Sequence, residues 1–286
     1  MQKLTQREPN RNVAGPRKNG QRNTRCYTTR MGGITMKNLG VFFCASLMAL
    51  AGSAAFSQED FPVLPIEMFG CNYQSGQNLG DLDSPSETFN EWADGEGITD
   101  LTSLTLSPHF FSPDLPYDVI GMDIWENGAA LGEGVASIAS DPSSVSEFNE
   151  VVDCPAHGLY ALVGVKPPEE GLVDGGLFEF SDCTVRRNRS ADEGIGAVAA
   201  IGDLMAPWNV GDAHGVLFPV AGETPDADYT FKWVTYYPSA QAFGTVFDEY
   251  ASGAVQTAGS IIDPVMECDI SRMYDVTVMR EAEAAE

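Results

Sequence analysis

The stretch Ile66-Glu67-Met68-Phe69-Gly70-Cys71 is similar to Phe178-Glu179-Phe180-Ser181-Asp182-Cys183, which lies 112 residues later. In both stretches a glutamate stands between two large apolar residues, and a cysteine follows that glutamate after three residues. Further residues match at offsets of 112 and 114: Tyr117 with Tyr229, Gly132 with Gly244, Cys154 with Cys268, and Tyr160 with Tyr274. Self-similarity at a fixed interval is typical of a duplicated unit. The sequence therefore predicts one fold repeated twice, with about 100 residues in each copy.

The cysteines agree with this duplication. Cys71 and Cys154 are 83 residues apart, and Cys183 and Cys268 are 85 residues apart. These are the four of the six cysteines that follow residue 57. Four cysteines allow three pairings, and the two nearly equal intervals select the pairing within each copy. We therefore predict the disulfides Cys71–Cys154 and Cys183–Cys268.

The residue pattern of the first copy predicts secondary-structure elements in the order strand, helix, strand, strand, helix, strand. Strands are expected at residues 66–73, 101–106, 117–125 and 158–165. A capping box at Ser84-Pro85-Ser86-Glu87 predicts the start of the first helix, and Asn127 is expected to cap the second. The expected buried helix residues are Phe89, Trp92 and Ala93 in the first helix, and Leu131, Val135 and Ile138 in the second.

The second copy repeats this order. Ser190 and Glu193 form its capping box, Ser239 is expected to cap its second helix, and Gly253 to end that helix in a left-handed turn. Strands follow at residues 215–220, 229–237 and 274–279. The expected buried residues of the two helices are Ile195, Val198, Ala199, Phe243, Phe247 and Tyr250.

This order is the split β-α-β arrangement of ferredoxin-like domains, in which two helices cover one face of an antiparallel sheet. The chain resembles the dimeric α/β-barrel superfamily, in which two such sheets pack face to face and form a barrel. The resemblance implies an α+β fold of two tandem ferredoxin-like repeats. It also implies that each disulfide links the end of the first strand of a repeat to the start of its last strand, which stabilises the fold by about 4 kcal/mol.

The expected organisation also includes an export signal. Met36-Lys37-Asn38, the apolar run 39–51 and the small residues that follow are typical of a secretory signal peptide at 36–57, with cleavage before Gln58. Residues 1–35 are interpreted as a disordered leader or, preferably, as sequence upstream of the true start. The predicted divisions are repeat 1 at 58–166, a linker at 167–174, repeat 2 at 175–280 and an acidic tail at 281–286.

Removing the leader makes the chain strongly acidic. Nine of the 16 Lys and Arg residues and one of the 41 acidic residues precede Gln58, so seven bases and 40 acids remain, a formal net charge of −33. Such a charge repels nucleic acid and anionic membranes, so neither is an expected partner, and no membrane span is expected once the signal is removed. We interpret the protein as exported to the periplasm or the exterior, with no prediction of its oligomeric state.

The candidate chemical groups are sparse. His157, between Cys154 and the last strand of repeat 1, is the one candidate for acid–base catalysis, and an ordinary surface histidine is the alternative. No two histidines are spaced as a metal pair, so no metal site is predicted. No cofactor is predicted either, although the resemblance includes haem-binding members.

Two further sites are predicted. Arg186, Arg187 and Arg189 precede the helix start at Ser190, and this combination is typical of an anion site; neutralisation of nearby acids is the alternative. Trp125, Trp233 and Tyr237 are expected to line a pocket between the two sheets, with a simple core role as the alternative. The favoured function is binding or shielding of a small molecule in an inter-sheet cavity. The alternatives are a monooxygenase-like enzyme and a structural or protein-interaction module with an acidic surface.

Overall fold

The computed structural model describes residues 63–113, 115–169, 171–223 and 227–283. The signal peptide, the leader and the last three residues of the acidic tail lie outside this range. The elements of repeat 1 are β1 (Val63–Tyr73), η1 (Leu79–Leu82), α1 (Asp83–Glu96), β2 (Leu101–Phe110), β3 (Val119–Trp125), α2 (Gly128–Ser140), η2 (Pro142–Val145), α3 (Phe148–Val151) and β4 (Val152–Lys166). Those of repeat 2 are β5 (Leu177–Val185), α4 (Ala191–Met205), η3 (Ala206–Trp208), β6 (Ala213–Ala221), β7 (Phe231–Tyr237), α5 (Ala240–Glu249), η4 (Tyr250–Ala254), α6 (Val255–Ile262), β8 (Met266–Cys268) and β9 (Arg272–Arg280).

Each repeat forms a four-stranded antiparallel sheet of the ferredoxin-like kind. The strand order is β4-β1-β3-β2 in repeat 1 and β9-β5-β7-β6 in repeat 2. Hydrogen bonds between β2 and β9 and between β4 and β6 join the two sheets at both edges. Among the described residues, eight strands thereby close a barrel, with β8 paired to the end of β5. The expected α+β barrel of two tandem repeats is confirmed.

The space between the sheets is largely filled by apolar side chains. Every barrel strand contributes to one core, because the residues at alternate positions point inward. Its buried members are Ile66, Leu104, Leu106, Met122, Tyr160, Phe178, Phe180, Ala213, Leu217, Val234, Tyr236, Tyr274 and Val276. Both repeats therefore share one interior, and neither has a complete core alone.

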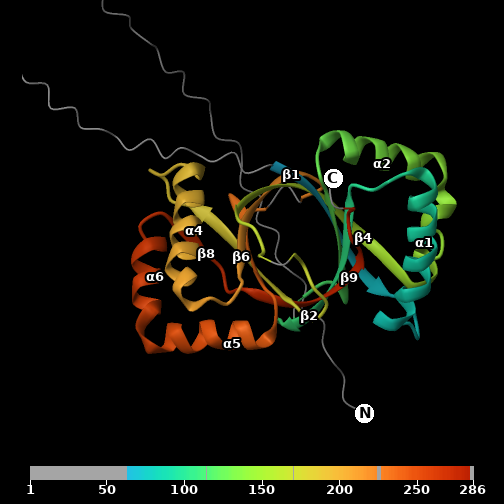
Figure 1. The fold of residues 1–286 in the computed structure, drawn as a ribbon. Helices are drawn as coiled ribbons and strands as arrows, with labels where there is room; N and C mark the ends of the chain where they lie inside the picture. The colour runs from blue at the N-terminus through green and yellow to red at the C-terminus, as the bar shows by residue number, and fades with distance from the viewer. Residues whose placement is uncertain (1–62, 114, 170, 224–226, 284–286) are drawn as a thin grey trace, which may run out of the picture. The chain divides into compact units, whose positions relative to one another are not determined.

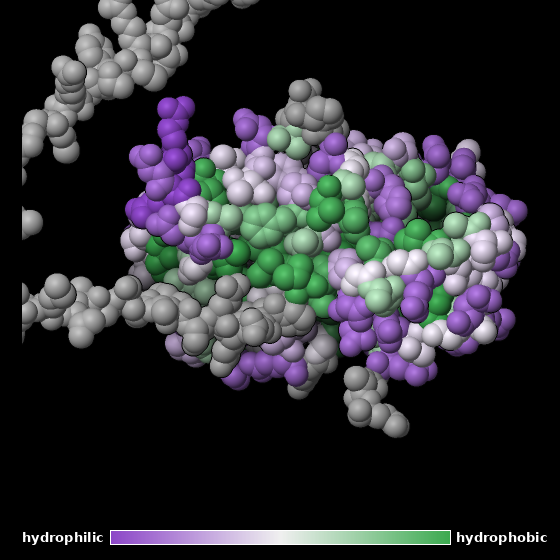
Figure 2. All heavy atoms as spheres, turned by 90° about the horizontal axis from the view of Figure 1, so that it is seen from above, coloured by the Kyte–Doolittle hydropathy of each residue, from purple (hydrophilic) through white to green (hydrophobic). Residues whose placement is uncertain are grey.

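The helices cover the outer faces of the sheets. Helices α1 and α2 lie on one side of the barrel, and α4, α5 and α6 lie on the other (Figure 1). Seen from above, apolar side chains gather between these two helical layers (Figure 2). Val220 of β6 is an apolar residue that is 59% exposed.

Because the helices of each repeat cover only the sheet of that repeat, there are two separate sheet–helix interfaces in the part of the chain that the structure describes (Figure 1).

Three of the four predicted helix starts are confirmed. Asn127 accepts hydrogen bonds from the backbone of Ala129 and Ala130, Ser190 and Glu193 form the capping box of α4, and Ser239 caps α5. The predicted capping box at Ser84–Glu87 is wrong. Helix α1 continues directly from η1, and the capping box lies earlier, between Asn78 and Asp81.

Two predicted helix faces need correction. Val135 is 45% exposed and Phe247 is 63% exposed. The buried positions are Ala130 and Gly134 in α2 and Val246 in α5, because these lie directly against the sheet. The helix that begins at Ser239 ends at Gly253, as expected, because Gly253 has a non-helical backbone with a positive φ of 133°; a second helix, α6, follows after the kink.

Both predicted disulfides, Cys71–Cys154 and Cys183–Cys268, are present. They are compatible with an exported protein. None of the helices in the described part of the chain is long and apolar enough to cross a membrane.

Candidate functional site

A row of polar side chains crosses the outer face of the repeat 1 sheet, under helices α1 and α2. The strand register places Ser103 of β2 opposite Asp123 of β3, and Asp123 opposite Glu67 of β1. Side chains directly opposite one another on antiparallel strands have Cβ atoms about 5 Å apart. Two carboxyl groups and a hydroxyl therefore lie side by side where a helix-covered sheet is ordinarily apolar.

Asp123 is the titratable group of this row with the clearest perturbation. Burial raises the pKa of Asp123 to about 6, the Ser103 hydroxyl opposes this rise by donating a hydrogen bond of 2.5 Å to Oδ1, and the nearby Glu67 carboxylate adds to it. Desolvation disfavours the charged form of a carboxyl group. Asp123 therefore changes its protonation state close to neutral pH.

Glu67 connects this row to the surface. Glu67 is buried, and its Oε2 accepts a 2.9 Å hydrogen bond from the Trp125 indole. Its Oε1 lies 2.8 Å from Nε2 of His157, whose side chain is 54% exposed and stacks on Phe69. His157, the predicted acid–base candidate, thus lies between a buried carboxylate and solvent.

These groups line a cavity of about 460 Å³ between the sheet and the helices of repeat 1. Its polar lining includes Glu67, Ser103, Asp123 and His157, together with Ser86, Asn90, Thr105 and Asn149. The apolar lining includes Leu82, Phe89, Val135, Ile138, Val145 and Phe148. A mostly apolar cavity with a few convergent polar groups and a shifted pKa is the usual form of a small-molecule site.

Repeat 2 carries a related but different row on its own sheet. His214, Thr235 and Glu179 lie opposite one another across β6, β7 and β5. Glu179 accepts a 2.9 Å hydrogen bond from the Tyr237 hydroxyl, just as Glu67 accepts one from Trp125. Thr235 stands where repeat 1 has Asp123, so the second row has no carboxyl group at its centre.

His214 is part of a buried network. Its Nε2 lies 2.6 Å from Asp212, and its Nδ1 lies 3.2 Å from the Thr235 hydroxyl. Lys166 of β4 donates a 2.8 Å hydrogen bond to the same Asp212. Burial would raise the pKa of Asp212, but the hydrogen bonds from His214 and Lys166 outweigh it and lower that pKa.

The three residues predicted to line an inter-sheet pocket lie outside the barrel. Trp125 belongs to the cluster under α1 and α2, whereas Trp233 and Tyr237 belong to clusters under α4, α5 and α6. They lie on opposite sides of the barrel because their strand positions point outward. A cavity of about 480 Å³ does exist at one end of the barrel interior, and its border includes Leu64, Leu162, Phe178, Val234, Tyr236, Pro167, Pro168, Gly171 and Leu172.

Two of the three arginines predicted to bind an anion, Arg186 and Arg189, form hydrogen bonds and ion pairs with other residues of the protein. Nε of Arg186 donates to the carbonyl of Asp263, and Nε of Arg189 to that of Pro264, at the end of α6. Arg189 also pairs with Glu193 at 2.8 Å. Ser190 caps α4.

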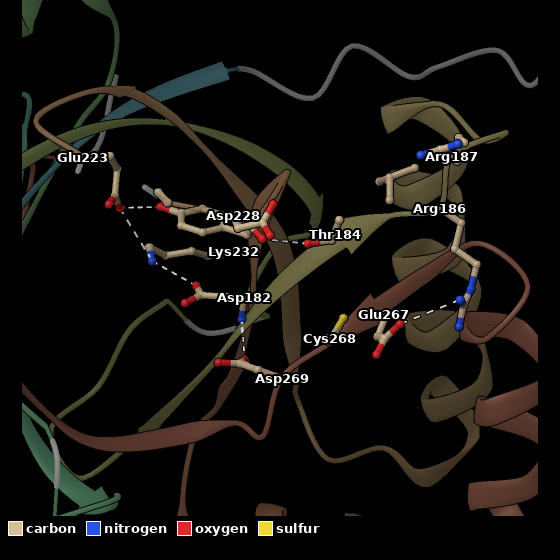
Figure 3. Close-up of a pocket in the computed structure, with 13 residues that line it drawn as sticks. Asp182, Thr184, Arg186, Arg187, Glu223, Asp228, Lys232, Glu267, Cys268 and Asp269 are labelled. Carbon is tan, nitrogen blue, oxygen red and sulfur yellow. Dashed lines mark hydrogen bonds and ion pairs between the residues drawn. The ribbon is translucent and has the colours of Figure 1, made fainter. Parts of the chain in front are cut away.

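Arg186 and Arg187 border an open pocket of about 850 Å³. Its carboxylates outnumber its bases: Asp182, Glu223, Asp228, Glu267 and Asp269 face Arg186, Arg187 and Lys232 (Figure 3). Lys232 pairs with Asp182 at 2.9 Å and with Glu223 at 3.6 Å. This balance is unfavourable for a small anion, and anion binding by Arg186, Arg187, Arg189 and Ser190 stays a prediction.

In two of the three histidines a carboxylate occupies Nε2, the nitrogen that usually binds iron, whereas in His109 the carboxylate contacts the other ring nitrogen, Nδ1. Nε2 of His157 faces Glu67 and Nε2 of His214 faces Asp212, so the nitrogen that would reach iron is occupied by a carboxylate. Nδ1 of His109 faces Asp275 at 2.9 Å. In the described ranges, no group of three or more His, Cys, Asp and Glu residues could hold a metal ion.

Asp123 and Ser103 were not identified by sequence reasoning. They are single polar residues in strands, and nothing local distinguishes them from solvent-facing positions. Glu67 carried a usable signal, because its match with Glu179 places a carboxylate in the same apolar strand of both copies. A charged residue repeated inside a buried strand is a candidate for a buried interaction.

No family model matches the chain, and no curated protein matches its sequence. Solved structures are similar to it at low identity. An anthrone oxidase-like protein is 17% identical with a TM-score of 0.45, over 80% of this chain and 98% of that chain. A heme-binding protein from Thermus thermophilus is 11% identical with a TM-score of 0.44, over 76% of this chain and 94% of that chain. A mutant chlorite dismutase from Candidatus Nitrospira defluvii is 7% identical with a TM-score of 0.46, over 76% of this chain and 91% of that chain.

Proposed function

We propose that this protein binds a small, mostly apolar and weakly acidic molecule, such as a phenol or an enol, in the helix–sheet cavity of repeat 1. The observation that carries the proposal is Asp123, a carboxyl group whose pKa is about 6 and which lines a mostly apolar cavity of about 460 Å³. A carboxylate in such surroundings favours a ligand that donates a proton or a hydrogen bond to it.

Each polar residue has a distinct role in this proposal. Ser103 donates to Oδ1 of Asp123, which leaves Oδ2 for the ligand hydroxyl. Above about pH 6 Asp123 is ionised and accepts a hydrogen bond from the ligand hydroxyl. His157, in contact with Glu67 and with solvent, exchanges protons between the row and the exterior.

The proposed reaction class is general-base catalysis, in which the Asp123 carboxylate takes the hydroxyl proton of the bound phenol or enol as that molecule reacts and leaves its oxygen as an anion. Oxidation of the resulting anion, as in the monooxygenase-like alternative, would be a further step that needs an external oxidant, and the proposal assigns no cofactor to it. We place this activity outside the cytoplasm, since two disulfides and a strongly acidic composition suit an exported protein.

Binding of 2-naphthol to the mature protein tests the proposal. We expect its affinity, measured by calorimetry, to rise as the pH increases through about 6, because Asp123 ionises there. Asp123→Asn should weaken binding at pH 7.5 by about tenfold or more, since a hydrogen bond to a charged group is lost. Glu133→Gln, at an exposed position of α2, is the matched control and should leave binding unchanged. Equal affinities in Asp123→Asn and the unaltered protein would refute the assignment.

The inter-sheet cavity is the second candidate site. Its volume of about 480 Å³ and its mostly apolar border favour a hydrocarbon-like molecule. We rank it below the repeat 1 cavity because its described border has no pair of opposed carboxyl groups like Glu67 and Asp123. Native mass spectrometry of the purified protein would reveal a retained apolar ligand.

A further inference from the structure

The cavity of repeat 2 differs in chemistry from that of repeat 1. It measures about 320 Å³ and lies between the β5, β6 and β7 strands and the helices α4, η4 and α6. Ile201, Met205, Val255, Ala258 and Ile262 supply apolar lining. Its polar border includes Glu179, His214, Thr235, Trp233, Tyr237 and Tyr250.

Two residues that the sheet contributes to this border already use acceptor atoms within the protein. Glu179 accepts from the Tyr237 hydroxyl, and the two nitrogens of His214 face Asp212 and Thr235. A ligand that donates a hydrogen bond to His214 or to Oε2 of Glu179 would therefore have to displace or share an existing interaction.

Two donors on the border are poorly satisfied. Nε1 of Trp233 is buried and has no hydrogen-bond partner among the described residues. The Tyr250 hydroxyl donates to the sulfur of Met205 at 3.8 Å, and a thioether is a weak acceptor. Buried donors without good partners are rare in native proteins, and a bound ligand is one way to satisfy them.

The charges on the border select against anions. Glu179 and Asp263 line the cavity, and a bound carboxylate would be repelled by both. Tyr250 remains a protonated donor over the physiological range, because burial, aided by the charge of Glu179, raises the pKa of its hydroxyl to about 12. The cavity thus offers donors to a neutral acceptor.

We propose that this cavity is a second binding site, which takes a small neutral carbonyl compound, such as an aromatic ketone, and holds its oxygen with the Trp233 N–H and the Tyr250 hydroxyl. The site is independent of the proposed function of repeat 1. The two cavities of the duplicated chain then select opposite partners, a hydrogen-bond donor in repeat 1 and an acceptor in repeat 2.

Acetophenone, with benzoate as the anionic comparison, tests this proposal on the full mature chain. We expect calorimetry to show saturable acetophenone binding and about tenfold weaker or no binding of benzoate. In protein labelled at methionine methyl groups, acetophenone should shift the NMR signal of Met205, which lines this cavity. The Met68 signal, from the barrel interior, should stay in place.

Trp233→Phe removes the indole donor and should weaken acetophenone binding by about fivefold, the effect of one ordinary hydrogen bond. Trp92→Phe is the matched control, because Nε1 of Trp92 is also buried without a partner among the described residues but lies in repeat 1. Tyr250→Phe should weaken binding in the same direction. The proposal is overturned if acetophenone does not bind, if it leaves the Met205 signal unmoved, or if Trp233→Phe and Trp92→Phe bind it equally.

Discussion

Asp123 and Thr235 occupy corresponding positions in the two repeats, yet they create different sites. Each is the middle residue of a polar row, between Ser103 and Glu67 in one sheet and between His214 and Glu179 in the other. The carboxyl group of Asp123 gives the repeat 1 cavity a hydrogen-bond acceptor, whereas the hydroxyl of Thr235 already forms a hydrogen bond with His214. Duplication therefore kept the framework of the row while single substitutions changed its chemistry.

The raised pKa of Asp123 predicts how stability changes with pH. In the unfolded chain this carboxyl ionises near its ordinary value of 3.8, and in the folded protein near 6. The contribution of Asp123 to the free energy of unfolding is therefore fully present below about pH 4 and is lost as the pH rises through about 6. The total loss is on the order of 3 kcal/mol. Asp123→Asn should flatten the fall in the free energy of unfolding between pH 4 and 7, measured with urea. An unchanged slope, equal to that of Glu133→Gln, would contradict the shifted pKa.

Helix α2 shows how close packing against the sheet depends on one position. Gly134 faces the ring of Trp125, and a Cβ atom at Gly134 would come within 2.0 Å of it. Trp125 also donates to Glu67, so the position of α2 and the polar row are coupled. The cavity of repeat 1 keeps its shape because a glycine allows this helix to approach.

Gly134→Ala should therefore destabilise the protein, by about 1–3 kcal/mol, because the added methyl group forces α2 or Trp125 to move. Gly132→Ala is the natural control: it lies in the same helix, and a Cβ atom there meets nothing within 4 Å. That variant should be neutral or more stable by up to about 1 kcal/mol, since alanine favours helix. Thermal unfolding of both variants compares them directly, and a similar loss in both would exclude the contact with Trp125 as the cause.

The whole barrel depends on both repeats. Its interior combines residues such as Ile66 and Met122 with Phe178 and Tyr274 from the other half. The edge strands β2 and β4 find their outer partners only in β9 and β6. Each disulfide, by contrast, lies within one repeat and cannot hold the halves together.

Separate expression of residues 58–166 and 175–280 tests this dependence. We expect each fragment alone to lack cooperative unfolding or to self-associate, because it exposes an apolar sheet face and two unpaired edges. Refolding the two together should restore a single complex, detected by size-exclusion chromatography and circular dichroism. A fragment that is monomeric and unfolds cooperatively by itself would show that the halves are independent.

The sequence by itself determined the duplication, the disulfide pairing, most helix caps and the order of the elements. These features are local or periodic, so spacing along the chain carries them. It did not determine which side of each strand faces the barrel, and the placement of Trp125, Trp233 and Tyr237 inside was therefore wrong. Only the tertiary structure brought together Ser103, Asp123, Glu67 and His157, because they come from four strands and meet through strand register. Burial, which shifts the pKa of Asp123, likewise exists only once the helices cover the sheet.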